Sequence, residues 1–436
     1  MAQPKMEPSE PKTENLTQFA AFVGLDWADQ KHDLCLSTAG SERVEHSVLE
    51  QSPEAIDQWA GRLRERFGGQ PVGICLEQSR GALIHALMKY EFLVLFPLAP
   101  ARLAKYREAV TSSGAKDDPT DANLLWDYLV RHRDRLVAWK PDGPLSRQIA
   151  LLAEARRDAV NLRTKLGNQL TAVLKGYFPQ ALSLAGETVH SPIACAFLMK
   201  WTTPEQLQRA QLQTVRKFYY SQNCRSESRI QERLELIKNL VPLTTDPAII
   251  NSSVMKVRML VAQLRPLAKS IDAMDRRLKE LMQQHPDAGL YVNLPGAGDV
   301  LAPRLLAAFG DDRDRMDSCT PLQCLSGIAP VTRRSGKRCS VQRRWACSKF
   351  LRQTFHEFAH HSRHHSAWAR AFYDSQRAAG KRHHTAVRAL AFKWIRILFR
   401  CWKTRTPYDE ATYLRALKKR NSPLLKYLDQ PATVCA

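Results

Sequence analysis

Four carboxylate side chains occupy positions from which they could bind a divalent metal ion. Asp26 and Glu77 each follow directly on a short apolar run, and Asp118 and Asp121 stand three residues apart further along the chain. Hard carboxylate oxygens on a rigid sheet suit Mg²⁺. One or two such ions, about 4 Å apart, can activate an attacking oxygen and stabilise a leaving oxygen. The pattern therefore indicates phosphoryl-transfer chemistry.

Each carboxylate also has a purely structural interpretation. Asp26 can simply end a strand, and Glu77 can form a surface salt bridge. The run from Asp118 to Asp121 is a favourable helix start, with Asp as the N-cap, Pro at the first helical position and Asp where the helix dipole favours it. Together, in this order along the chain, the four residues favour a site over four separate structural roles.

The elements that would position these residues alternate between strands and helices from residue 19 to about residue 135. Three successive strands followed by strand–helix units are typical of a mixed α/β sheet of the ribonuclease H kind. In that arrangement the first-strand Asp and the fourth-strand Glu lie side by side, and a helix brings further carboxylates against them. The expected strands are 21–25, 32–37, 42–49, 72–76 and 92–98, and the expected helices are 53–67, 79–90 and 100–110.

The rest of the chain is expected to be mainly helical. Apolar residues at three- and four-residue spacing predict long helices over 145–174 and 251–283, which would pair either as a coiled coil between subunits or as a helical hairpin within one. After them, Gly296 and Gly298 in a Leu-Pro-Gly-Ala-Gly turn suggest a helix-hairpin-helix-like contact to a DNA phosphate, although a plain helical connection uses the same glycines. A basic loop is expected after Pro330.

These patterns define the expected domain organisation. The predicted segments are a disordered tail (1–17), an α/β domain of the ribonuclease H kind that carries the four carboxylates (18–138), a helical or coiled-coil region (139–286), a basic, mainly α C-terminal domain (287–410) and a tail (411–436).

Charge points to a polyanionic partner. The formal net charge is +22, and residues 331–420 alone hold 23 Lys and Arg against four Asp and Glu, which leaves +19 in that segment. We expect no membrane span, because no sufficiently long apolar run occurs. The polar N-terminus does not resemble a signal peptide, and the scattered cysteines fit a reducing, cytoplasmic environment. The cluster Cys319, Cys324, Cys339 and Cys347 matches no common zinc spacing.

One further motif is typical of a different class of enzyme. His356, Glu357 and His360 match the H-E-x-x-H pattern of zinc proteases. The extended form of that motif, with Gly and a further His, is absent. Seven of the thirteen histidines lie between residues 356 and 384 among Arg and Lys, as expected of a nucleic-acid-binding face. We therefore interpret the motif as accidental.

Three motifs in this order resemble those of the DEDD-type insertion-sequence transposases, the group named after IS110 and IS1111. The strand ends at Asp26 and Glu77 with Asp118 and Asp121 resemble its D…E…D-x-x-D signature. The Leu-Pro-Gly-Ala-Gly turn resembles its L-P-G-x-G element. Leu-Ser-Gly-Ile-Ala-Pro (325–330) followed by Arg-Ser-Gly resembles its A-G-L-x-P…S-G element. The resemblance spans roughly residues 20–400.

The resemblance implies a RuvC-like domain, a coiled-coil linker and a serine-bearing domain that excises and inserts DNA, guided by a structured (bridge) RNA. It implies that Ser335 is the nucleophile, and that one or two Mg²⁺ ions are held by the four carboxylates. A split site and a coiled coil suggest a homodimer or homotetramer, associated with the nucleoid of a prokaryotic cytoplasm. The expected nucleic-acid-binding residues are Lys116, Gly296, Gly298, Arg333, Arg334, Lys337, Arg338, Arg343, Arg344, Lys349 and Arg352.

Two departures from the family pattern bear on these assignments. Asp117 offers an extra carboxylate, but spacing to Asp121 favours Asp118. A family stretch that commonly contains glycine is here Arg-Arg-Trp-Ala-Cys-Ser-Lys (343–349), which leaves Ser340 as an alternative to Ser335.

The leading interpretation is a DNA transposase/recombinase that forms a covalent DNA–phosphoserine intermediate. The first alternative is a RuvC-like structure-specific endonuclease with water as the nucleophile. The second is a non-catalytic nucleic-acid-binding protein.

Overall fold

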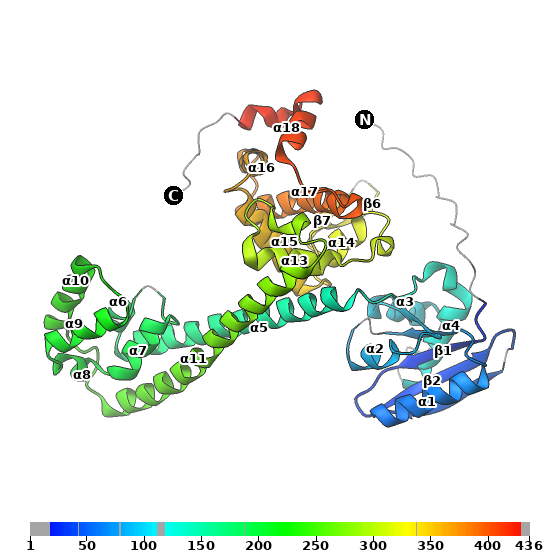
Figure 1. Ribbon diagram of the computed structural model, residues 1–436, viewed down its shortest axis with the longest axis horizontal. Coiled ribbons are helices and arrows are strands. Elements are labelled where there is room, and N and C mark those ends of the chain that lie inside the picture. Colours follow the sequence, from blue (N-terminus) through cyan, green and yellow to red (C-terminus); the bar gives the residue numbers. More distant parts are fainter. Residues whose placement is uncertain are drawn as a thin grey trace. The chain divides into compact units, whose positions relative to one another are not determined.

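The computed structural model describes residues 18–41, 43–77, 80–110, 118–186, 188–336 and 338–428. The chain forms two compact units, Met1–Pro141 and Asp142–Ala436 (Figure 1). Lys116, Asp117 and Lys337, and the tail predicted over 1–17, lie outside the described residues.

A five-stranded sheet with the order β3-β2-β1-β4-β5 forms the centre of the first unit. Strand β1 pairs antiparallel with β2 and parallel with β4, and β4 pairs parallel with β5. This mixed sheet confirms the predicted α/β fold of the ribonuclease H kind. Its elements are β1 (Ala21–Asp26), β2 (Lys31–Thr38), β3 (Val44–Glu50), α1 (Pro53–Arg66), β4 (Val72–Leu76), α2 (Ala82–Leu87), β5 (Leu93–Pro97), α3 (Pro100–Val110), α4 (Asp118–His132) and η1 (Arg133–Arg135).

The two faces of this sheet are covered by different helices. Because side chains alternate along a strand, Ala21, Val23 and Leu25 of β1 all enter a core shared with α1 and α2. Phe22 packs instead against the core that contains residues of α3 and α4. The side chain of the last β1 residue, Asp26, therefore belongs to the α4 face.

Two long helices, α5 (Pro144–Tyr177) and α11 (Pro247–Gln284), lie side by side in the second unit (Figure 1). Ser146 contacts His285 at one end, and Arg156 pairs with Asp275 about three turns further along, so the two helices run antiparallel. Each helix starts with proline, which is pre-organised for the first helical position. The two predicted long helices are thus confirmed.

Small helices between α5 and α11 build a separate core. It contains the aromatic side chains of Tyr177, Phe197, Phe218 and Tyr219, all buried. The helices are α6 (Ala181–Leu184), α7 (Pro192–Lys200), α8 (Pro204–Gln208), α9 (Leu212–Ser221) and α10 (Glu227–Lys238).

The C-terminal elements form a further core around three fully buried tryptophans, Trp368, Trp394 and Trp402. The region predicted as a tail from residue 411 contains most of a helix, α18. The elements are α12 (Gly289–Val292), α13 (Gly298–Phe309), η2 (Arg313–Arg315), α14 (Thr320–Leu325), β6 (Val331–Ser335), β7 (Arg338–Gln342), α15 (Lys349–Ser362), α16 (Ala367–Ala378), α17 (His383–Thr404), α18 (Glu410–Lys419) and η3 (Pro423–Tyr427).

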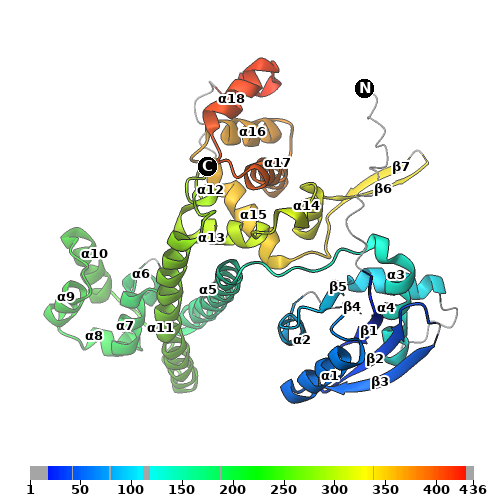
Figure 2. The ribbon, with the colours of Figure 1, turned by 45° about the vertical axis from the view of Figure 1, so that its right-hand side comes forward.

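The basic loop expected after Pro330 is instead a two-stranded antiparallel hairpin of β6 and β7, which extends away from the helices of its unit (Figure 2). No helix in the described part of the chain is both long and apolar enough to cross a membrane.

Candidate active site

Asp26 and Glu77 lie at the same edge of the sheet. Strands β1 and β4 run parallel, and Leu25 is the register partner of Leu76, so each carboxylate residue directly follows one member of that pair. Leu25 and Leu76 both enter the core on the α1 face. Continuing the alternation brings Asp26 and Glu77 to the opposite face, where both are half-buried.

Helix α4 packs directly on β1 at Gly24. A Cβ atom at Gly24 would lie 2.1 Å from the backbone oxygen of Ala122 and 2.4 Å from the backbone nitrogen of Trp126. Only a residue without a side chain allows this approach.

Two side-chain contacts fix the direction of α4 across the sheet. The Cys35 thiol donates to Asn123 Oδ1 (3.0 Å), and Trp126 Nε1 donates to the Ser37 hydroxyl (2.9 Å). Cys35 is level with Gly24 and Ser37 with Phe22, so α4 runs from the end of β1 towards its beginning. The first turn of α4, which carries Asp118 and Asp121, therefore points to the sheet edge of Asp26.

Asp121 is buried, with 3% of its surface exposed, and is held by an ion pair with Arg107 of α3. Arg107 Nε donates to Asp121 Oδ1 at 3.0 Å, and the terminal nitrogen contacts the same oxygen. Asp118 begins α4 as predicted, but its side chain lies outside the described part. Among the described residues no three metal-ligating side chains converge on one point. The structure thus brings the backbone positions of the predicted carboxylates to one edge, and the side chains described there form no closed metal cluster.

A carboxylate missed by the sequence interpretation lies beside Asp26. Asp33 of β2 is its direct register partner and is half-buried, and directly paired residues project to the same face of a sheet. The alternation of β2 could have revealed this, because Leu34 and Leu36 face the opposite core.

Ser335 is the last residue of β6, at the turn of the exposed hairpin. It pairs with Arg338, and the next residue, Gly336, takes the positive φ (+53°) that tight hairpin turns favour. Arg333 pairs with Ser340 on the same strands. Ser335 therefore shares one face with two guanidinium groups and with Ser340, and all four residues are exposed.

The other predicted nucleic-acid contacts fall into two groups. Arg334 lies on the opposite face of the hairpin, and Gly298, Arg343 and Lys349 are exposed. Gly296 has a packing role instead, since a Cβ there would lie 3.0 Å from the backbone of His361. Half-buried members of the set also make internal contacts: Arg344 to Ala329 O (3.4 Å) and Arg352 to Cys347 Sγ (3.6 Å).

The H-E-x-x-H motif serves a structural ion pair. Glu357 binds Arg304 (2.5 Å), which is 2% exposed, and Arg157 of α5 (3.2 Å). Burial raises the pKa of Glu357, but these two guanidinium groups outweigh it and leave the pKa below its usual value. His356 is kept neutral, because burial and the nearby Arg388 lower its pKa to about 4. The carboxylate thus joins α15 to α13 and α5.

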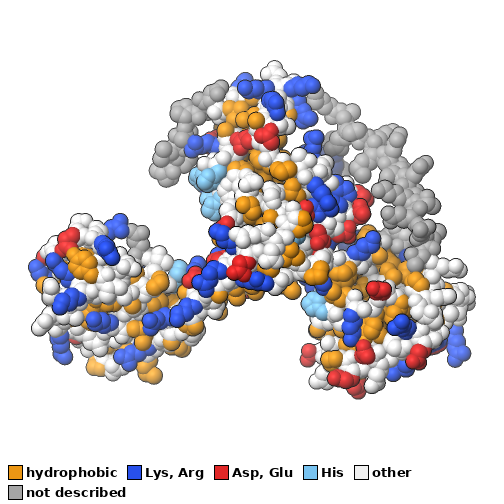
Figure 3. All heavy atoms as spheres, viewed as in Figure 1, with side chains coloured by type: hydrophobic (Ala, Val, Ile, Leu, Met, Phe, Trp, Pro, Cys, Tyr) orange, Lys and Arg blue, Asp and Glu red, His pale blue; other side chains and the backbone are white. Residues whose placement is uncertain are grey.

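Histidine side chains gather on one face of the second unit (Figure 3). Ring contacts link His360 to His361, His364 and His383, with centroids 5.5–5.8 Å apart. Burial and then the charge of Arg363 lower the pKa of His360 to about 4. His360 is therefore neutral at pH 7 on this face.

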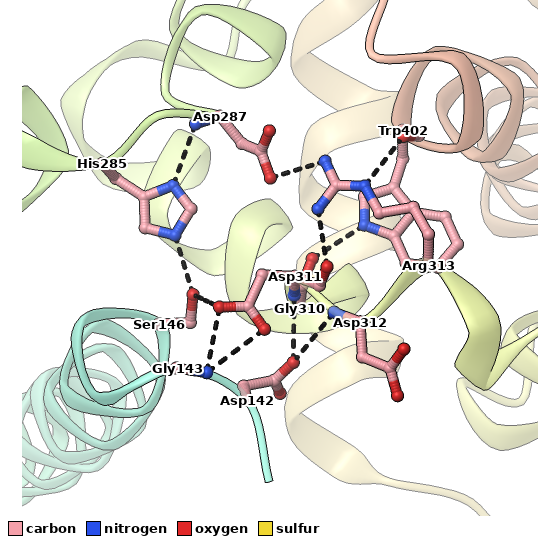
Figure 4. A network of polar contacts seen from close by, with 10 residues as sticks. All are labelled: Asp142, Gly143, Ser146, His285, Asp287, Gly310, Asp311, Asp312, Arg313 and Trp402. Atoms are coloured by element: carbon pink, nitrogen blue, oxygen red, sulfur yellow. Dashed lines mark hydrogen bonds and ion pairs between the residues drawn. The ribbon is translucent and has the colours of Figure 1, made fainter. Parts of the chain in front are cut away.

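A buried Ser–His–Asp network links the start of α5, the end of α11 and the segment after α13 (Figure 4). His285 Nδ1 accepts the backbone N–H of Asp287 (3.1 Å), so its proton lies on Nε2 and is donated to Ser146 Oγ (2.7 Å). Ser146 in turn donates to Asp311 Oδ2 (2.8 Å). The direction of donation is opposite to that of a histidine activating a serine nucleophile. The network is therefore a structural clamp.

Comparison with known proteins gives consistent matches over most of the chain. Residues 23–179 match the DEDD-type IS110 family model, described as a transposase, and residues 291–374 match the model described as the transposase IS116/IS110/IS902 family. The mini-circle putative transposase for IS117 of Streptomyces coelicolor is 28% identical over 398 residues, which cover 89% of this chain and 95% of the relative.

Two further relatives come from other insertion elements. The insertion element IS900 uncharacterized 42 kDa protein of Mycobacterium paratuberculosis is 25% identical over 72% of this chain and 78% of its own length. The insertion element IS110 uncharacterized 43.6 kDa protein of Streptomyces coelicolor is 23% identical over 89% of this chain and 95% of its own length.

Proposed function

The chain belongs to the IS110 family of DEDD transposases, and we propose that Ser335 is the nucleophile with which it exchanges DNA strands. As an insertion-sequence transposase it is a DNA recombinase, an enzyme of phosphoryl transfer.

The observation that carries the proposal is the placement of Ser335 at an exposed hairpin turn with Arg333 and Arg338 on its face. A hydroxyl there can reach a phosphate bound from solvent, and guanidinium groups stabilise the charge that develops on the equatorial oxygens. Ser340 lies on the same face, but further from the turn and inside the strand ladder.

The proposed chemistry conserves phosphodiester bonds. Ser335 Oγ attacks the DNA phosphorus, the new Oγ–P bond replaces one P–O bond to deoxyribose, and the departing deoxyribose oxygen takes up a proton. The proton of the serine hydroxyl passes to a carboxylate acting as base. Attack by a hydroxyl of another DNA end then releases Ser335 and joins the strands, so no external energy source is needed.

Proteins of the DEDD family use a divalent metal, and we propose Mg²⁺ here. The donor set of Asp26, Glu77, Asp118 and Asp121 supplies hard oxygens, and the strand register and the direction of α4 bring their backbone positions to one sheet edge. When bound, one or two ions would lower the pKa of the attacking hydroxyl and neutralise phosphate charge. Arg107 balances Asp121 electrostatically and would be displaced or repositioned on ion binding.

DNA is the substrate of a transposase, and we propose the element ends and the target as its two forms. We also propose a structured non-coding RNA as guide, and a homodimer or homotetramer in the nucleoid region of a prokaryotic cell. The excess of Lys and Arg over 331–420 supports a second polyanion. Ser335 and the carboxylates belong to different compact units, so they can meet within one chain or between chains.

The test is the yield of covalent protein–DNA adducts with element-end DNA, trapped by denaturation in the presence of Mg²⁺ and the guide RNA. Ser335→Ala should abolish adducts and strand exchange, while DNA binding stays within about twofold. Ser340→Ala is the matched control and should keep most of the adduct yield. Adducts from Ser335→Ala at the normal yield would refute the serine mechanism, and cleavage with no adduct in the unaltered protein would favour water as the nucleophile.

A further inference from the structure

Trp345 is an exposed aromatic side chain in the most basic part of the chain. Its exposed fraction is 74%, far more than is usual for an indole. The guanidinium carbon of Arg343 lies 4.5 Å from the centroid of the ring. A cation packed on an open indole is typical of surfaces that receive a nucleic acid base and its phosphate.

The backbone on both sides of Trp345 is anchored, so its exposure is not that of a loose loop. Cys347 packs on Gly327, where a Cβ would lie 2.5 Å from the thiol sulfur. Arg344 Nε donates to Ala329 O (3.4 Å), and the N–H of Ser348 donates to Leu325 O (2.9 Å). The indole is thus held outward on a fixed support, which reduces the entropy lost when a ligand stacks on it.

Positive charges gather beside this support. Burial lowers the pKa of the Arg388 guanidinium in α17, and the charges of Arg343 and Arg352 lower it further. None of the three forms an ion pair with a carboxylate of the described residues. Like charges held together without a counter-charge are stabilised by an anion, and a phosphate fits guanidinium geometry.

We propose that Trp345 stacks an unpaired DNA base while Arg343, Arg352 and Arg388 bind the adjoining phosphate. The base must be unpaired or flipped, because within a duplex both of its faces are covered by its neighbours. Strand β7 connects this support to the turn of Ser335 over five residues, about 17 Å of extended chain. The assignment rests on the proposed function, and it places the bound nucleotide near the phosphate that Ser335 attacks.

The test measures binding of the full-length chain to a twelve-nucleotide single-stranded DNA containing 2-aminopurine, and to the matching duplex, without Mg²⁺. Trp345→Ala should weaken single-strand binding about tenfold and abolish quenching of the probe, because stacking of one base is lost. Trp345→Phe should retain binding within about threefold. Duplex affinity should change less than twofold in both variants.

Controls separate stacking from charge and from folding. Val341→Ala removes another exposed apolar side chain, from β7, and should leave single-strand binding unchanged. Arg388→Gln should reduce the steepness of the salt dependence, whereas Trp345→Ala should not. Thermal melting of each variant checks that the core is intact.

Three results would overturn the proposal. One is unchanged single-strand affinity in Trp345→Ala. Another is an equal loss of single-strand and duplex binding. The third is a loss seen only with an RNA oligonucleotide of the same sequence, which would make RNA the occupant. None of these results depends on catalysis, because an inactive Ser335→Ala protein should bind the probe normally. Adducts formed by a different residue would refute the serine mechanism, but they would not bear on base stacking at Trp345.

Discussion

The backbone of α4 at Ala122 lies so close to Gly24 of β1 that no Cβ atom fits between them. This contact sets the height of α4 above the sheet and thereby the position of its first turn, with Asp118 and Asp121, relative to Asp26. A residue with no side chain of its own therefore positions the candidate metal site.

Gly24→Ala should destabilise the first unit by about 3 kcal/mol, because the added methyl group collides with main-chain atoms that cannot rotate away. Gly73→Ala is the matched control. Gly73 is on the neighbouring strand β4, where an added Cβ meets only aromatic carbons at 3.4–3.5 Å. Thermal or urea unfolding of the two variants should differ clearly, and similar midpoints would show that α4 can shift to accommodate a methyl group.

Glu77→Gln keeps the shape of the side chain and removes its charge, so we expect Mg²⁺-dependent adduct formation to fall at least a hundredfold while DNA binding stays within about twofold. Glu50→Gln provides the comparison, because Glu50 also ends a strand but is exposed at the end of β3. Titration of adduct yield against Mg²⁺ concentration is the measurement. Equal activity of both variants would show that Glu77 is not a metal ligand.

Arg107→Ala leaves the buried Asp121 without the guanidinium group that balances it. In the absence of metal, we expect the free energy of unfolding to fall by about 3 kcal/mol, the size typical of removing one partner from a buried pair. Added Mg²⁺ should then raise the melting temperature of this variant more than that of the unaltered protein, since the ion replaces the lost positive charge. Arg131→Ala, which breaks a solvent-exposed pair with Asp127, should leave the stability nearly unchanged and show no such recovery. No extra metal effect in Arg107→Ala would argue against Asp121 as a ligand.

His285 makes the stability of the second unit depend on pH. Burial lowers its pKa in the folded protein, despite the opposing charges of Asp287 and Asp311. Because the unfolded chain binds the proton more readily, the stabilisation is complete above about pH 6.5 and is lost as pH falls towards the folded-state pKa. Protonation would also direct an Nδ1–H at the N–H of Asp287.

Unfolding of the second unit should therefore become easier between pH 7 and pH 5, as followed by tryptophan fluorescence. His285→Gln should be less stable at pH 7.5 by about 1–3 kcal/mol, since buried partners lose a hydrogen bond. It should also show a shallower pH dependence. His46→Gln, at an exposed position on β3, serves as the control. A pH profile unchanged in His285→Gln would assign the acid sensitivity to other groups.

The first unit was predictable because its apolar residues alternate cleanly. Ala21, Val23 and Leu25 define a strand whose next residue must leave the core, and the proline after Asp118 fixes the start of α4. The alternation locates Asp26 at a strand end. It does not disclose the Arg107–Asp121 pair, because nothing local relates α3 to α4.

The hairpin was missed for a physical reason. Most residues of β6 and β7 are polar, and the three exceptions, Val331, Cys339 and Val341, give only a weak period-two apolar signal; all residues but Val331 are exposed. The one available cue was Ser335-Gly336 before a basic residue, a two-residue turn signature. Among the small helices between α5 and α11, α6 and α8 have only four and five residues, too few to show a repeating apolar face.

The hairpin buries almost none of its side-chain surface, so its sequence contributes little to the stability of the fold. Substitutions in β6 and β7 are limited only by what the strands touch outside the molecule. A transposase can therefore acquire new DNA preferences there without losing stability, and exchanging residues 331–342 between relatives offers a direct way to transfer such preferences from one insertion element to another.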